Sequence, residues 1–272
     1  MKIAIIGFGN LGKTFASSFI KSRFIKNEDI YVVTRTLPKL DMTFGIPMDN
    51  FQTTANSKIA GVDILILSTK PQDFDSVASA FNGLLSEEQV VLSVMAGVSI
   101  ENIKEKLGVK KVIRSMPNLG TQIGLGMTVF SASAETDRKD LFIVQNLINT
   151  TGKSIYVEDE SLINPATAVS GSGPAYVFYF MNAMIKAAEE FGFSSSEAEV
   201  LVHQTFLGAV NLQSSSNLSN EELIMKVASK GGTTESALKV FNANILDKII
   251  GQAMQSANER AIELGAYKNQ KK

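Results

Sequence analysis

Short runs of β-branched and other apolar residues alternate with helical stretches up to about residue 157 of this chain. Such alternation is typical of βαβ units, and it predicts an α/β fold with a mostly parallel sheet covered by helices. Two of the runs are continuously apolar, as expected of central strands that are buried on both faces. The strands are expected at residues 2–6, 30–33, 63–68, 90–95, 111–114, 127–130 and 154–157.

Beyond about residue 157 the strand pattern is replaced by helical periodicity. Ser194 and Glu197 have the spacing of a capping box and precede an apolar helical face. The sequence therefore predicts two domains, an α/β domain over residues 1–157 and an all-helical domain over residues 158–272.

The last helix is expected over residues 245–264. Residues 242–244 interrupt the helical pattern, so Asn244 is expected to cap this helix and Gly265 to end it. Residues 175–185 are almost entirely apolar, which predicts a helix that is buried all round. A helical domain of about 115 residues has few other residues with which to bury both faces of such a helix. A second subunit is therefore expected to cover it.

Composition excludes several kinds of chemistry. The 272 residues include one His and no Cys, so a zinc site built from these residues, a Cys nucleophile and disulfides are ruled out, and no metal is expected. The 26 basic and 27 acidic residues give a net charge of −1, which favours a small-molecule partner over nucleic acid or a membrane surface. No apolar run is long enough for a signal peptide or a membrane span, so a cytoplasmic location is expected.

A glycine-rich motif stands directly after the first expected strand and before a helix. Gly7 permits a tight turn, Gly9 lets a pyrophosphate approach the backbone, and Gly12 allows close packing of helix on strand. The helix N-terminus adds partial positive charge for the phosphates. The motif predicts a dinucleotide site, and the alternative is a glycine turn in an α/β fold that binds no ligand. Its residues are Gly7, Phe8, Gly9, Asn10, Leu11 and Gly12.

The end of the second strand indicates which dinucleotide is bound. Enzymes that use NAD usually carry a carboxylate there, on the ribose 2′-hydroxyl, and this chain has none. Arg35 follows the strand instead, with Lys39 close behind, and its guanidinium could pair with a 2′-phosphate. This favours NADP(H), with NAD(H) as the alternative if Arg35 is an ordinary surface residue.

Further cofactor contacts are expected where other strands end, because ligands of open α/β sheets bind outside the carboxyl ends of the strands. Asn118 would bind through its amide, whereas Lys70 could equally be a surface charge. The residues assigned to the cofactor on this ground are Ser68, Lys70, Pro71, Ala96, Gly97 and Asn118.

Two clusters of small residues precede helices in the second half, at residues 170–176 and 229–235. The second cluster offers consecutive backbone amides at a helix N-terminus, which is an anion site suited to a substrate carboxylate. The alternative is a loop with glycine turn chemistry and a Thr cap.

The chain resembles the pyrroline-5-carboxylate reductase family from its first residue to about Gly265. The resemblance implies a Rossmann domain followed by an all-helical dimerisation domain, a homodimer, and often a decamer of dimers. It also implies the last step of proline biosynthesis, in which NADPH or NADH reduces L-1-pyrroline-5-carboxylate to L-proline. The resemblance rests on residues 7–12, 70–72, 116–118, 170–176 and 231–234.

The resemblance implies roles for individual residues. The amides of Gly231, Gly232 and Thr233 would bind the substrate carboxylate, and the following residue, Thr234, would hydrogen-bond the ring nitrogen as the catalytic residue. Ser172, from the first small-residue cluster, is also assigned to the substrate site.

One departure from the family pattern is Lys230, where a Pro usually precedes the two glycines. Loss of the proline is expected to loosen the loop, and the added cation to help attract an anionic substrate. His203 lies in the middle of an expected helix, and packing or a place on the helix surface is favoured over catalysis.

Imine reduction suits the composition, since a protonated imine already carries positive charge and needs neither metal nor imidazole. Two other functions remain open. One is reduction of a different imine or of a small hydroxy acid. A hydroxy-acid enzyme would require a positioned acid–base group such as Lys, and no Lys stands in a fitting helical context. The other is a nonenzymatic regulator that senses NADP.

Overall fold

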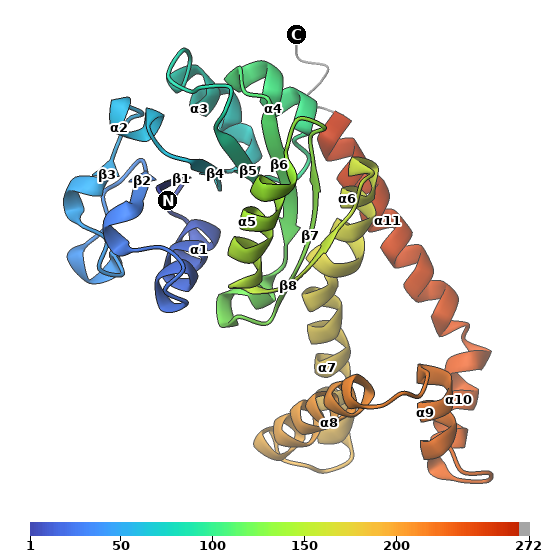
Figure 1. Ribbon diagram of the computed structural model, residues 1–272. Helices are drawn as coiled ribbons and strands as arrows, with labels where there is room; N and C mark the ends of the chain where they lie inside the picture. Colours follow the sequence, from blue (N-terminus) through green and yellow to red (C-terminus); the bar gives the residue numbers. More distant parts are fainter. Residues whose placement is uncertain (267–272) are drawn as a thin grey trace. The chain divides into compact units, whose positions relative to one another are not determined.

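The structure is a computed structural model that describes residues 1–266, and it forms two compact units (Figure 1). The first unit comprises Met1–Ser172 together with the described residues from Ala257, and the second is Gly173–Ser256. The first unit extends past the boundary predicted at residue 157, because helix α6 (Ile163–Ala166) packs on the sheet.

The first unit is built on an eight-stranded sheet in the order β3-β2-β1-β4-β5-β6-β7-β8. Only β6 and β7 pair antiparallel, so the predicted mostly parallel sheet is confirmed. The first six strands have the order of a dinucleotide-binding fold, and the two-residue β3 is the strand that the sequence analysis missed. The strands are β1 (Ile3–Ile6), β2 (Ile30–Val33), β3 (Phe51–Gln52), β4 (Ile64–Leu67), β5 (Val90–Ser93), β6 (Lys111–Pro117), β7 (Gly126–Ala132) and β8 (Gly152–Tyr156).

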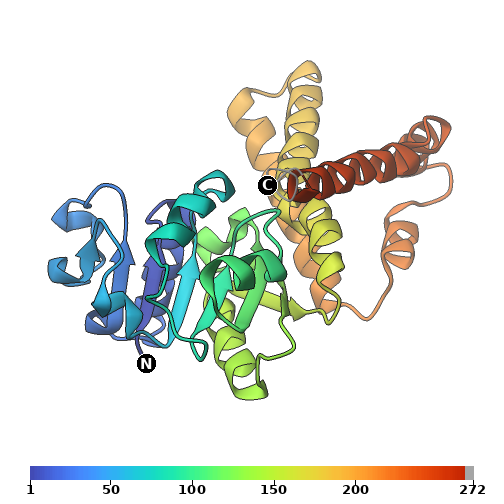
Figure 2. The ribbon, with the colours of Figure 1, turned by 90° about the horizontal axis from the view of Figure 1, so that it is seen from above.

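Helices cover both faces of this sheet (Figures 1 and 2). Successive strand residues point to opposite faces, so Ile3 and Ile5 pack with α1 and α5 while Ala4 and Ile6 pack with α2, α3 and α4. All four of these β1 residues are buried, as expected of a central strand. The helices are α1 (Asn10–Lys21), α2 (Ser57–Ala60), α3 (Phe74–Ala80), α4 (Ile100–Leu107) and α5 (Arg138–Asn149).

A buried ionic network ties the sheet to the segment that follows it. The guanidinium of Arg114, in β6, donates to Glu160 Oε1 at 2.8 Å and to Asn164 Oδ1 at 3.0 Å. The same Glu160 oxygen accepts from the amide of Ile100 at 3.0 Å, at the start of α4. The Glu160 carboxylate therefore joins its own segment to β6 and to the start of α4.

Replacing Glu160 with alanine is expected to destabilise the protein by about 2–3 kcal/mol, because it leaves a buried guanidinium without its counter-charge. The expected loss of unfolding free energy is smaller than for a fully buried ion pair, because the Glu160 side chain is 29% exposed. Urea unfolding measures it. The matched control is Glu101→Ala, whose carboxylate is 71% exposed and pairs loosely with Lys104, and equal shifts in the two variants would contradict the expectation.

The second unit is entirely helical. Two capping boxes are formed, at Ser194 with Glu197 and at Ser219 with Glu222. The box predicted at Ser194 and Glu197 is therefore confirmed. The helices are α7 (Gly173–Glu190), α8 (Ser195–Ser215), α9 (Asn220–Val227), α10 (Thr233–Ala243) and the first part of α11 (Leu246–Ala266), which continues into the first unit.

The predicted capping of the last helix is wrong. Asn244 ends α10, where its side-chain amide donates back to the Val240 carbonyl oxygen at 2.9 Å. Helix α11 begins at Leu246, so the residue directly before it is Ile245 and not Asn244. The chain turns at Ile245 instead, whose φ of 46° lies in the left-handed region. Gly265 lies within α11, which extends to Ala266, the last residue described.

Helix α7 differs from its prediction. None of its residues is buried within the chain, and Phe178 and Tyr179 are 56% and 74% exposed. A helix buried all round is therefore wrong for the single chain, and cover by a second subunit is the expectation that fits this exposure. Over the described part of the chain, no helix combines the length and the apolar character needed to cross a membrane.

Candidate cofactor and substrate sites

A cleft of about 570 Å³ opens at the carboxyl ends of β3, β2, β1 and β4. This is the switch point of the sheet, where the strand order reverses and ligands of open α/β sheets bind. Several predicted cofactor residues line it together, namely Gly7, Phe8, Gly9, Arg35, Ser68 and Lys70.

The glycine loop in this cleft leaves no room for side chains at two positions. Gly7 has φ +97°, and a Cβ there would lie 2.9 Å from the Ser68 carbonyl oxygen. A Cβ on Gly12 would lie 2.1 Å from the Gly7 carbonyl oxygen, which is far inside contact distance. A Cβ on Gly9 would meet nothing within 4 Å, so the space in front of this residue is open. The loop thus forms a cradle that fits the phosphates of a dinucleotide.

Gly9 also begins α1, and it has no side chain to cap the helix. The amides of Asn10, Leu11 and Gly12 lie in the first turn, where no carbonyl of the same helix precedes them as a partner. These amides and the helix dipole favour an anion at the loop. The neighbouring Phe8 side chain is buried against Phe51, so this residue faces the cleft mainly with its backbone.

Ser68 holds the loop in place. Its hydroxyl contacts two carbonyl oxygens of the loop, Gly7 at 2.7 Å and Ile6 at 3.1 Å. A second bond, from the Gly7 amide to the Val33 carbonyl oxygen at 2.8 Å, joins the loop to β2. The loop is therefore pre-formed by its neighbours on both sides.

Arg35 lines the cleft directly after β2. Its side chain is 86% exposed, and its guanidinium lies 3.7 Å from the carboxylate of Asp73. Asp73 comes from η4 (Pro71–Asp73) after β4, and it is not among the residues predicted from the sequence. The cleft wall thus holds two cationic side chains, Arg35 and Lys70, and one carboxylate.

Hydroxyl groups on this wall were also missed. Thr53 and Thr54 follow the two-residue strand β3, which is too short to produce a periodic signal in the sequence. Thr34 and Thr36 flank Arg35, and their position after β2 was the signal that could have identified them. These side chains can hydrogen-bond a ribose or a phosphate.

Other predicted cofactor residues lie outside the cleft wall, and their roles remain predictions. The Asn118 amide oxygen already accepts from the amides of Gly120 and Met127, both at 3.1 Å. Gly97 packs against the end of α11, where its Cβ would lie 3.1 Å from the Gly265 nitrogen. The residues outside the wall are Asn10, Leu11, Gly12, Pro71, Ala96, Gly97 and Asn118.

In the second unit, the predicted substrate loop precedes α10. The Gly231 amide donates to the carboxylate of Glu235 at 2.7 Å, and the Gly232 amide donates to the Ser229 carbonyl oxygen at 3.0 Å. Thr233 is the first residue of α10, so its amide lacks a helical partner. Gly231 adopts φ +76°, a conformation that favours glycine.

The first small-residue cluster contains a π-helical turn over Thr167–Gly171, directly before α7. The Ser172 amide donates to the Thr167 carbonyl oxygen at 2.8 Å and closes this turn. Such turns occur often at functional sites. The nearby Tyr176 hydroxyl is inaccessible and has no hydrogen-bond partner among the described residues. Ser172 remains a prediction for the substrate site.

Lys230 and His203 both lie on the surface. Lys230 is exposed in the loop between α9 and α10. His203 is exposed on α8, which agrees with the helix-surface role rather than with packing. Within residues 1–266 there is no group of three or more His, Cys, Asp and Glu residues that could hold a metal ion.

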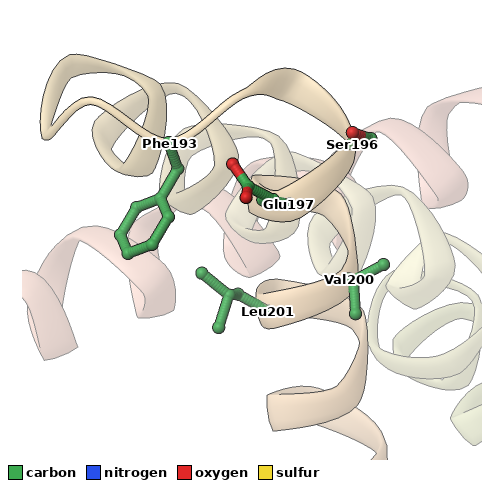
Figure 3. A pocket seen from close by; sticks show the side chains of 5 residues that line it. All are labelled: Phe193, Ser196, Glu197, Val200 and Leu201. Atoms are coloured by element: carbon green, nitrogen blue, oxygen red, sulfur yellow. The ribbon is translucent and has the colours of Figure 1, made fainter.

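A separate hollow lies beside the start of α8, where Phe193 and Leu201 point toward one another (Figure 3). Its acidic residue, Glu197, accepts from the Ser194 hydroxyl and amide, and these bonds lower the pKa of Glu197 below its ordinary value. The Glu197 carboxylate therefore forms part of the N-terminal capping box of α8. The hollow offers apolar surface rather than a reactive group.

Two family models match the chain. Residues 160–264 match the family described as pyrroline-5-carboxylate reductase dimerisation. Residues 2–97 match the family described as NADP oxidoreductase coenzyme F420-dependent. The two matches correspond to the helical part and to the nucleotide-binding part.

Curated relatives and solved structures match along nearly the whole chain. The pyrroline-5-carboxylate reductases of Vibrio alginolyticus and Pseudomonas aeruginosa are 35% and 34% identical, with 97% of this chain and 97% and 96% of theirs covered. A pyrroline-5-carboxylate reductase structure from Coxiella burnetii has a TM-score of 0.88 and 32% identity, covering 97% of this chain and 98% of its own. The Plasmodium falciparum enzyme with NADP bound has a TM-score of 0.86, 26% identity and the same coverage.

Proposed function

Because this chain belongs to the pyrroline-5-carboxylate reductase family, we propose that it reduces L-1-pyrroline-5-carboxylate to L-proline. The reduction uses a nicotinamide dinucleotide and completes proline biosynthesis. The chain combines a nucleotide-binding domain with a helical dimerisation domain, which correspond to its two family-model matches.

One observation in the substrate loop carries the proposal. A carboxylate already accepts a hydrogen bond there, since Glu235 Oε2 lies 2.7 Å from the Gly231 nitrogen. The loop geometry is therefore compatible with a carboxylate ligand, and the amide of Thr233 points from the helix end as a second donor. The substrate carboxylate takes the place of Glu235, which retains Lys239 as a partner at 3.5 Å.

In this proposal the chain's residues mainly hold and orient the substrate. The carboxylate is anchored by the amides of Gly231 and Thr233, because the amide of Gly232 donates to the Ser229 carbonyl oxygen. The Thr234 hydroxyl accepts a hydrogen bond from the protonated ring nitrogen. Two points of attachment fix which face of the ring is presented for reduction. A reduced nicotinamide, when bound, supplies the hydride for the imine carbon. Positioning of this kind is worth about 7–11 kcal/mol of the barrier in favourable cases.

The reaction itself is tested by product analysis. Incubation of the protein with L-1-pyrroline-5-carboxylate and NADPH is expected to form one proline for each NADPH oxidised. Consumption of NADPH without proline would contradict the proposed substrate.

NADP(H) is the proposed dinucleotide, on the strength of Arg35 in the cleft wall and the lack of a carboxylate directly after β2. Replacing Arg35 with alanine is expected to weaken NADPH binding about tenfold, the effect of losing a charge-assisted hydrogen bond to the 2′-phosphate, and to leave NADH binding unchanged. Titration of both dinucleotides measures this. Lys39→Ala, with its cation outside the cleft wall, is the control, and an equal loss for NADH would contradict the assignment.

The exposed faces of α7 and the dimerisation match support a homodimer, and a decamer of dimers is proposed on the family resemblance. Sedimentation velocity distinguishes these assemblies from a monomer. The cytoplasmic location remains the proposal from the sequence.

A further inference from the structure

We infer that Asp73 is a specificity-determining residue, because its carboxylate competes with the 2′-phosphate of NADP(H) for the guanidinium of Arg35. Asp73 belongs to η4 after β4, and Arg35 follows β2, on the other side of β1. The two side chains meet at the cleft, 3.7 Å apart between Arg35 Nη2 and Asp73 Oδ2. This inference rests on the proposed preference for NADP(H).

Asp73 is the sole carboxylate among the described residues that line the cleft. Its side chain does not cap α3, the helix that it precedes, so the carboxylate has no helix-capping role. Its side chain is 39% exposed, so the charge is partly removed from solvent on the cleft wall. The arrangement places a negative charge beside the group that would receive a dianionic phosphate.

The consequence differs for the two dinucleotides. A 2′-phosphate must draw Arg35 away from Asp73 and bind close to a like charge, which lowers the gain from the new pair. A ribose 2′-hydroxyl carries no charge and leaves the Arg35–Asp73 pair intact. Asp73 therefore narrows the difference in affinity between NADP(H) and NAD(H) and makes the site more tolerant of either.

Binding measurements on Asp73→Asn test this directly. Isothermal titration with adenosine 2′,5′-bisphosphate is expected to show about threefold tighter binding than wild type, the scale of an exposed ion pair. Adenosine 5′-monophosphate, which lacks the 2′-phosphate, is expected to bind as before. The same pattern is expected for NADP⁺ against NAD⁺. Unchanged binding of the bisphosphate, or an equal gain for the monophosphate, would overturn the inference.

A matched control comes from the same segment. Asp75 lies in α3, pairs with Lys106 and does not line the cleft, so Asp75→Asn removes the same charge at a distance from the site. This variant is expected to bind both probes as wild type does. A gain as large as that of Asp73→Asn would assign the effect to net charge and overturn the inference.

The Arg35→Ala background separates this inference from the proposed function. The gain from Asp73→Asn is expected to disappear there, because the contested guanidinium is gone. If Asp73→Asn still tightens binding of the bisphosphate in the Arg35→Ala background, the inference that Asp73 competes for Arg35 is overturned. If Arg35→Ala alone leaves binding of the bisphosphate unchanged, the proposed preference for NADP(H) is contradicted as well. If Arg35→Ala weakens binding of the bisphosphate while Asp73→Asn leaves it unchanged, only the inference about Asp73 is contradicted.

Discussion

Replacing Gly12 with alanine is expected to destabilise the nucleotide-binding unit by about 3 kcal/mol and to abolish dinucleotide binding. The added Cβ would lie 2.1 Å from the Gly7 carbonyl oxygen, and overpacking against rigid neighbours costs this much. The carbonyl cannot easily withdraw, since the Ser68 hydroxyl holds it at 2.7 Å and the Gly7 amide is bonded to Val33. Urea unfolding and NADPH titration measure the two effects.

Gly9→Ala is the matched control for the fold. A Cβ on Gly9 would meet nothing within 4 Å, and its φ of −79° suits any residue, so stability is expected to change by less than about 0.5 kcal/mol. The methyl group would stand in the open space of the loop, so dinucleotide binding is still expected to weaken. A Gly12→Ala protein that unfolds at the same urea concentration as wild type would contradict the role given to this packing.

Replacing Thr234 with alanine is expected to lower kcat/KM for pyrroline-5-carboxylate about 10- to 100-fold, because the ring nitrogen loses its partner at a cost of about 1–3 kcal/mol. The residue is half-buried in the first turn of α10. The KM for NADPH is expected to be unaffected. Steady-state kinetics with each substrate varied in turn measures both.

Two further variants control for damage to the loop. Thr233→Ala keeps the backbone amide assigned to the substrate carboxylate, so it is expected to retain most of the activity. Thr234→Ser restores the hydroxyl and is expected to recover most of the loss. Kinetics of Thr234→Ala equal to those of wild type would remove this hydroxyl from the account.

Features governed by neighbouring residues could be predicted from the sequence. The Ser99 hydroxyl caps α4 and Gly108 ends it at φ +66°, as local capping rules require. The turn at Gly7 and the tight packing at Gly12 follow from the glycine spacing, because a side chain at either position would collide with the backbone. The caps of α4 and the packing at Gly12 involve only neighbouring residues, whereas the Ser68 backbone that a side chain at Gly7 would meet follows β4.

Features that depend on distant segments, or on the path of a particular loop, could not be predicted. Asp73 and Arg35 are brought together only by the strand order, and β3 is too short to give a periodic pattern. The bond from the Gly231 amide to Glu235 depends on the turn that the loop takes before α10. Asn244 failed as a cap because it ends α10, and Ile245 stands between it and the first residue of α11.

The most direct test of the reaction follows the hydrogen itself. Wild-type protein is supplied with L-1-pyrroline-5-carboxylate and NADPH that carries deuterium at C4 of the nicotinamide, and the proline formed is analysed by mass spectrometry and NMR. With deuterium on the transferred face, the expected product is L-proline with one deuterium at the ring carbon that formed the imine. Absence of proline at saturating concentrations of both substrates, or proline without deuterium when either C4 position is labelled, would contradict reduction of the imine by this protein.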